Sequence, residues 1–483
     1  MTASPALDPE PGALGSLVRK GLSWSFLNTI IGRAGTVLVG IVLARLLSPE
    51  DYGVFAVALV ALNALLAMNE LGVSLAIVRW PGELERIAPT VTTLALAGSV
   101  GLYGLCFVAA PWLATAMGAP EATGVLRLLC AGVVIDGATA VPAALLTRTF
   151  RQGRRMVADF TSFGISTVLS IWLAVAGYGA WSLAWGRLAG NGVAAVLFVL
   201  LAPARFRPGF DAAQARRLLA FGLPLAGSSL LVFAMLNVDY VVVGSLLGPV
   251  ALGFYLLAFN LSSWPVNVFS VAVRRVSLAG FSRLVEDPGR LRSSFARSLG
   301  LLMTATLPVC VLLGLMADPL VRFVYGDRWA PAAGALRWLA LLSAARVAAE
   351  LAYDLLVAVG RSRSTLWLQG AWTLALIPVL ALGARLAGIS GVAAGHAAVA
   401  LLLVVPAFAV SLARVGIGPR ALGAELTRPL LGSIVVAACC LVALALPSGP
   451  FLQLAVAGAS GLGAYAALVV FPLRRNRTSL PQL

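Results

Sequence analysis

Apolar runs of twenty or more residues recur along the whole chain, and no other sequence feature limits its fold so tightly. Each run is long enough to cross the hydrocarbon core of a bilayer, which is about 30 Å thick. Hydrophobic residues make up 60% of the chain and charged residues only 11%, too few to cover the surface of a soluble protein of this length. The sequence therefore predicts an all-α polytopic membrane protein.

The apolar runs predict about fourteen transmembrane helices. Their ranges are 22–47, 52–78, 88–116, 122–147, 156–176, 178–201, 217–247, 249–273, 293–317, 333–359, 363–386, 389–413, 429–447 and 450–472. Only Gly177-Tyr178-Gly179 separates the fifth range from the sixth, so thirteen helices is the alternative count.

Basic residues predict how the chain is oriented. If the number of spans is even, 26 of the 35 Lys and Arg residues lie on the side that holds both termini, and six lie on the opposite side. Cytoplasmic loops carry such an excess of basic residues, so both termini are expected in the cytoplasm. The arginines form short clusters between apolar runs and no basic domain, which argues against nucleic acid as the partner despite the net charge of +16.

One motif occurs twice in the sequence. LLSPEDYGVFAVA at 46–58 and LLGPVALGFYLLA at 246–258 share five of thirteen residues, among them a proline and a glycine four residues later. Both copies read as helix starts, at the second and the eighth span. An offset of six spans means that both copies cross the membrane in the same direction, which predicts two six-helix lobes related by a parallel repeat.

The repeat predicts the following organisation. The expected parts are a cytoplasmic N-terminal tail at 1–21, an N-lobe at 22–201, a cytoplasmic linker at 202–216, a C-lobe at 217–413, two extra C-terminal helices at 429–472 and a cytoplasmic tail at 473–483.

The chain carries little chemistry outside its spans. No hydrophilic stretch is much longer than the segment 274–292, and no phosphate-binding loop of the Walker type is present. The five cysteines all lie in apolar segments without metal-ligand spacing. We therefore expect a transporter and not an enzyme, with no cofactor, coupled to an H⁺ or Na⁺ gradient.

Several stretches resemble the polysaccharide transporter family of the multidrug/oligosaccharidyl-lipid/polysaccharide exporter superfamily. The resemblance rests on LARLLSPEDYGVFAVALVALNALLAMNELGVSLAIVRW in and around the second span, PAALLTRTFRQGRRMVADF at 142–160, the segment 223–284 and the segment 326–364. Ser48 stands where the family commonly has glycine, and the last two spans match no motif of the family.

The resemblance implies a flippase of the bacterial inner membrane. Such proteins move undecaprenyl-diphosphate-linked oligosaccharide to the periplasmic leaflet for exopolysaccharide or lipopolysaccharide O-antigen assembly. The implied partners are that lipid, the bilayer and, as candidates, polysaccharide polymerase and assembly proteins. The alternatives are a drug/cation antiporter of the same superfamily, a membrane-embedded polymerase or ligase, and a scaffold without transport activity.

Polar and charged residues inside the spans are the candidate site, because burying them in a membrane is costly. Cationic and amide side chains suit a diphosphate and sugars, and the cavity candidates are Arg33, Arg187, Arg346, Asn28 and Asn237. The coupling-ion candidates are Asp354, Glu350, Asp239, Asp136 and Glu70.

Structural roles compete with these assignments. Arg346, Glu350 and Asp354 are spaced by four residues and share one helix face, so the first two are able to neutralise each other. Asp136 and Arg187 are candidates for a second ion pair. Asp239 is a candidate for a structural hydrogen bond with Asn237. His396, the only histidine, is either a proton relay or a hydrogen-bonded structural residue.

Overall fold

The protein is described by a computed structural model covering residues 35–69, 84–149, 151–204, 206–267, 280–281 and 284–470. Every regular element in these residues is a helix, which confirms the all-α fold. Ten of the described helical segments are long and apolar enough to cross a membrane. The chain divides into two compact units, residues 1–253 and 254–483, and each is described here by itself.

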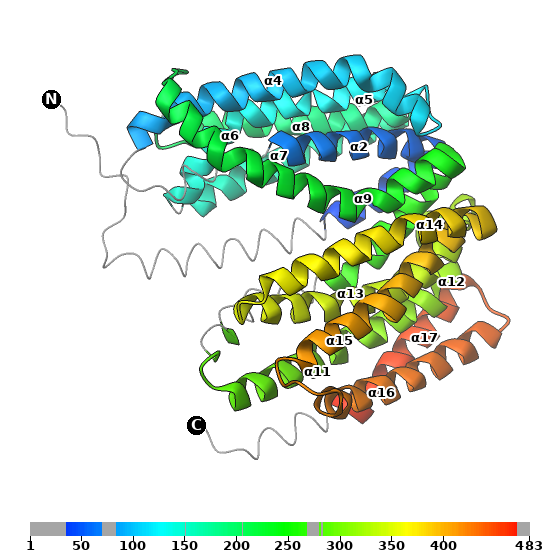
Figure 1. Cartoon of the computed structure of the whole chain (residues 1–483). Helices are drawn as coiled ribbons and strands as arrows, with labels where there is room; N and C mark the ends of the chain where they lie inside the picture. Colours follow the sequence, from blue (N-terminus) through cyan, green and yellow to red (C-terminus); the bar gives the residue numbers. More distant parts are fainter. Residues whose placement is uncertain are drawn as a thin grey trace. The chain divides into compact units, whose positions relative to one another are not determined.

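The first unit is a bundle of long helices (Figure 1). It contains the helix Gly35–Leu46 and helices α2 (Pro49–Asn69), α4 (Leu84–Ala116), α5 (Ala122–Cys130), α6 (Gly132–Arg148), α7 (Gln152–Val175), α8 (Ala180–Leu201) and most of α9 (Ala212–Ser262). The span predicted at 122–147 consists of α5 and α6, which meet at Ala131.

Small residues hold α7 and α8 together. A Cβ atom added to Gly186 would collide with Ser170 of α7, and the Ser162 hydroxyl donates a hydrogen bond to the Gly190 carbonyl at 2.7 Å. Such contacts drive helix association in a membrane, where burying apolar side chains brings no advantage over lipid. The small residues of α8 therefore fix which face of that helix turns toward α7.

In two places a pair of predicted spans is joined at non-helical residues without a longer loop between the two helices. The predicted span 217–247 and the first part of the span predicted at 249–273 lie on α9, as two helices that meet at Gly248 with φ 83° and ψ 179°. α9 ends at Ser262, and residues 268–273 lie outside the described residues. The spans predicted at 363–386 and 389–413 lie on α14 (Ser362–Val399), a π-helical turn (Ala400–Val404) and α15 (Val405–Ala413). Non-helical backbone at Ala387 and Gly388 breaks α14 at the predicted boundary.

The second unit contains the end of α9 and the helices from α11 onward. These are α11 (Pro288–Leu315), α12 (Ala317–Tyr325), a 3-10 turn (Asp327–Trp329), α13 (Ala332–Ala358), α14, α15, α16 (Pro419–Ala445), α17 (Pro450–Tyr465) and a π-helical turn (Ala466–Val470). The segment 317–331, which falls between the predicted spans 293–317 and 333–359, forms α12 and the 3-10 turn.

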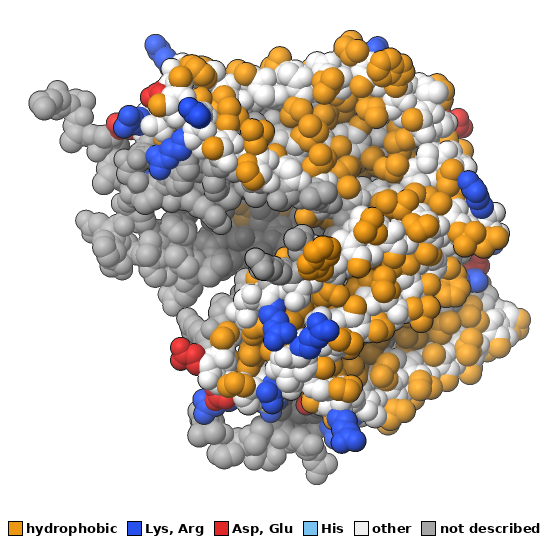
Figure 2. All heavy atoms as spheres, viewed as in Figure 1, with side chains coloured by type: hydrophobic (Ala, Val, Ile, Leu, Met, Phe, Trp, Pro, Cys, Tyr) orange, Lys and Arg blue, Asp and Glu red, His pale blue; other side chains and the backbone are white. Residues whose placement is uncertain are grey.

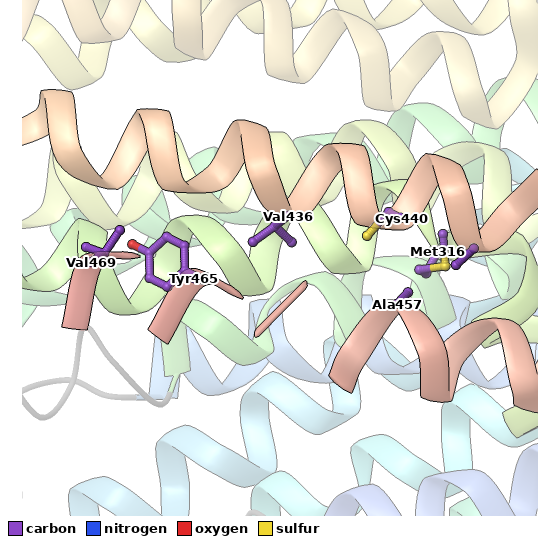
Figure 3. Close-up of a cluster of buried hydrophobic side chains, with 7 residues drawn as sticks. Met316, Val436, Cys440, Ala457, Tyr465 and Val469 are labelled. Atoms are coloured by element: carbon purple, nitrogen blue, oxygen red, sulfur yellow. The ribbon is translucent and has the colours of Figure 1, made fainter. Parts of the chain in front are cut away.

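The last two long helices pack against α11 through a buried apolar cluster (Figure 3). Its members are Met316, Val436, Cys440, Ala443, Ala457, Tyr465 and Val469. The Tyr465 hydroxyl also donates a hydrogen bond of 2.8 Å to the Thr304 carbonyl of α11. Hydrophobic side chains are spread over the described helices on the face in Figure 2, and charged groups are sparse on it.

Candidate functional site

Asp136 lies near the middle of the predicted fourth span, on an exposed position of α6. The amide nitrogen of Asn69 on α2 donates a 3.0 Å hydrogen bond to its Oδ2 atom. The other end of that amide, Asn69 Oδ1, is buried and has no hydrogen-bond partner among the described residues. A buried acceptor in this state costs about 1–3 kcal/mol. The pair therefore retains hydrogen-bonding capacity for another group.

Arg187 is a half-buried cation on α8. Trp181 and Trp185 of the same helix are both exposed. At 100° per residue, Arg187 points about 120–160° away from these two tryptophans around the helix axis. No hydrogen bond or ion pair joins Arg187 to any residue within the described ranges, and Asp136 is paired with Asn69 and not with Arg187. Arg187 is therefore a charge on the side of α8 away from the exposed tryptophans.

The two candidates on α9 differ in burial. Asn237 is half-buried, and its amide donates to the Phe233 carbonyl one turn earlier at 2.9 Å. Asp239 is only 1% exposed, and its Oδ1 atom accepts a 3.0 Å hydrogen bond from the Tyr240 backbone amide. Asp239 makes further polar or electrostatic contacts. This carboxylate therefore belongs to the interior of the first unit.

The charged residues of α13 lie in the second unit among neighbouring helices. The Arg346 guanidinium lies 5.6 Å from the ring centroid of Phe259, a cation–π contact. Asp354 is 4% exposed and Glu350 is half-buried, and both make polar or electrostatic contacts. His396 on α14 is buried edge-on against Trp372, with ring centroids 6.5 Å apart.

Three candidates, Arg33, Asn28 and Glu70, lie outside the described residues.

Two polar residues of the first unit were not among the sequence candidates, namely Asn69 and Asn191. Each is an amide inside an apolar run, and that signal was available from the sequence. No group of three or more potential metal-ligating side chains occurs in the part of the chain that the structure describes.

Comparisons with known proteins identify relatives by sequence. Residues 42–334 match the model of a family described as polysaccharide biosynthesis protein. The succinoglycan biosynthesis transport protein ExoT of Rhizobium meliloti is 31% identical over 72% of this chain and 71% of its own length. The lipopolysaccharide biosynthesis protein WzxC of Escherichia coli is 23% identical over 79% of this chain and 78% of its own length.

Solved structures share the fold at lower sequence identity. The lipid II flippase MurJ, in an inward closed conformation, superposes with a TM-score of 0.77 at 15% identity and covers 94% of this chain and 99% of its own. An inward-facing multidrug resistance MATE family transporter gives a TM-score of 0.62 at 20% identity, over 79% of this chain and 94% of its own. The fold is therefore one used by membrane transporters.

Proposed function

Because this chain belongs to the family of polysaccharide biosynthesis proteins, we propose that it moves a lipid-linked oligosaccharide across the bacterial inner membrane. The substrate class is undecaprenyl-diphosphate-linked oligosaccharide, destined for an exopolysaccharide or for O-antigen. Its relative from Rhizobium meliloti is named a transport protein of succinoglycan biosynthesis, which supports this assignment. The chain is a transporter in this proposal, with the bilayer and the lipid as its partners.

The observation that carries the proposal is the Arg187 guanidinium, which lies inside a span without a counter-ion among the described residues. An uncompensated cation is costly in hydrocarbon, so such residues face a water-filled cavity and mark the path of a substrate. A diphosphate supplies the negative charge that this arginine lacks. A hydrophobic drug cation does not, which favours the flippase over a cation antiporter.

We propose alternating access between two lobes as the mechanism of transport. The parallel repeat behind this proposal is supported by a reciprocal contact within the first unit. The Cα of Gly53 lies against the Pro249 carbonyl, and the Cα of Gly253 lies against the Pro49 carbonyl. A twofold axis between the two copies of the motif generates such a pair of contacts.

The energy source in this proposal is an H⁺ or Na⁺ gradient. Asp354 and Asp239 are the buried carboxylates that suit a coupling ion, and the MATE-like fold is compatible with that role. Both termini lie in the cytoplasm, as the arginine distribution predicts. Polysaccharide polymerase and assembly proteins are the proposed partners that receive the product.

The test is reconstitution of the full chain into liposomes with labelled undecaprenyl-diphosphate-linked oligosaccharide. We expect the label to reach the opposite leaflet, faster when a proton or sodium gradient is imposed. Arg33→Ala, in the first predicted span, is expected to slow exchange. If the folded wild-type protein moves no lipid but extrudes a cationic dye such as ethidium, the antiporter alternative is correct.

A further inference from the structure

Four polar residues of the first unit lie on the three neighbouring helices α2, α6 and α8. Asn191 is on α8, one turn after Arg187, and its Nδ2 atom would be 3.3 Å from a Cβ atom added to Gly132 of α6. Gly132 lies one turn before Asp136 on α6, and Asp136 is bonded to Asn69. The glycine thus allows the Asn191 amide to approach α6 at a level between the arginine and the carboxylate.

The order of these groups follows from helix geometry. Helices α6 and α8 run in the same direction, because the chain crosses once between them through α7. Four residues along a helix rise about 6 Å, so Arg187 and Asp136 lie about 12 Å apart along the bundle, with Asn191 between them. We call Arg187, Asn191, Asn69 and Asp136 the polar ladder.

The ladder is chemically different at its two ends. Arg187 is a donor only, and it has no acceptor among the described residues. At the other end, Asn69 Oδ1 is a buried acceptor that receives no hydrogen bond from the part of the chain that the structure describes, and the Asp136 carboxylate is an exposed acceptor. Asn191 offers both a donor and an acceptor. A ligand that fits must carry anionic oxygens at one end and hydroxyl donors at the other.

We propose that the polar ladder binds the headgroup of the transported lipid, with a phosphate at Arg187 and sugar hydroxyls at Asn191 and the Asn69–Asp136 pair. This assignment rests on the proposed function and adds to it the residues that select the sugar. Phosphate oxygens are the natural acceptors for a guanidinium, and only the hydroxyls of the sugars supply donors to Asn69 and Asp136.

Binding measurements with two lipids test the ladder. The probes are undecaprenyl diphosphate alone and the lipid-linked oligosaccharide that accumulates in a strain lacking this transporter. Dissociation constants are measured on the full chain in lipid–detergent micelles. Arg187→Gln is expected to weaken both probes about tenfold. Asn69→Ala and Asn191→Ala are expected to weaken the sugar-bearing probe about fivefold and to leave undecaprenyl diphosphate unchanged.

Matched controls separate the ladder from general damage to the fold. Arg127→Gln removes an arginine of α5 that contacts Phe107, with the guanidinium 4.2 Å from the ring centroid. Asn63→Ala removes an amide from another face of α2. Both are expected to bind the two probes like the wild type. Asp136→Asn keeps the size of the side chain, and its thermal unfolding shows whether the α2–α6 contact persists.

The outcomes distinguish the two proposals. If Asn69→Ala and Asn191→Ala fold but weaken both probes equally, or weaken neither, the sugar assignment is wrong while wild-type leaflet exchange still supports the flippase. The ladder is supported if the dissociation constants of the two probes no longer differ in Asn69→Ala and Asn191→Ala. If the folded wild type neither binds nor exchanges the sugar-bearing lipid, both proposals are overturned.

Discussion

The two copies of the repeated motif share their packing and differ in their helix ends. In the first copy α2 begins at Pro49 after Ser48, whose backbone amide and hydroxyl both donate to Asp51 Oδ2 at 3.0 and 2.7 Å. The Ser48 hydroxyl accepts from the Asp51 amide at 3.1 Å, which completes a capping box. The second copy lies inside α9, where Gly248 turns the chain and no polar cap is present.

This difference separates the residues of the motif that make the helix–helix contact from those that cap a helix. The proline-to-glycine spacing is the same in both copies because Gly53 and Gly253 each approach the backbone of the other copy. The polar residues occur only where a helix starts after a loop and leaves backbone amides without partners. The motif therefore combines a shared contact with a local cap that only the first copy needs.

The largest effect is expected when either glycine of the reciprocal contact is replaced. The Cβ of Gly53→Val collides with the Pro249 carbonyl, so the two helices must separate, which lowers the free energy of unfolding by about 3 kcal/mol or more. Gly253→Val is expected to match it. The measurement is thermal unfolding in detergent. Gly40→Val is the control, because a Cβ at Gly40 meets no atom within 4 Å, and equal melting of all three variants would contradict the contact.

A smaller loss is expected from Gly248→Ser, which makes the second copy resemble the first. The backbone at Gly248, with φ 83° and ψ 179°, belongs to a region that only glycine adopts without strain. We expect the free energy of unfolding to fall by about 2 kcal/mol. Chemical unfolding in mixed micelles measures it, and an unchanged midpoint would show that the kink relaxes when glycine is replaced.

Asp51→Ala tests the cap of the first copy. The substitution removes both acceptor contacts to Ser48 and a 3.1 Å bond from the Ala180 amide at the start of α8. The expected loss is about 1.5 kcal/mol in the free energy of unfolding. Hydrogen exchange at residues 50–53 and 180–183 localises the effect. Asp51→Asn retains an acceptor and is expected to lose less.

The smallest effect is expected from Ser48→Gly, the exchange reciprocal to Gly248→Ser. Glycine is accepted at the N-cap position with a loss of only a few tenths of a kcal/mol. The same unfolding measurement compares the two exchanges directly. A loss from Ser48→Gly as large as that from Gly248→Ser would mean that the two copies do not differ in the way described above.

Much of the fold was predictable from local sequence. The breaks at Gly248 and at Ala387–Gly388 fall where glycine interrupts an apolar run, and the predicted span boundaries lie at the same positions. The short helix α12 was not predictable in this way. The segment 317–331 forms α12 because Val321 and Tyr325 are buried among neighbouring helices, although charged residues give the segment the composition of a loop.

The candidate site was predictable only in part. The sequence identified Asp136 and Arg187 as costly residues inside spans, and their own positions were sufficient for that. It paired them with each other as the structural alternative, whereas Asp136 is bonded to Asn69, 67 residues away. Asn69 and Asn191 escaped notice because a neutral amide in an apolar run is a weaker signal than a charge.

The sequence by itself determined that this chain is an all-α membrane protein with many spans, because long apolar runs have no other stable state than a helix in lipid. It also determined where the helices break. Only the tertiary structure decided which polar residues meet. In a membrane the lipid-facing and the core-facing sides of a helix are both apolar, so periodicity does not reveal the rotation of a helix about its axis. That rotation is decided by small-residue contacts such as those of Gly132, Gly186 and Gly53.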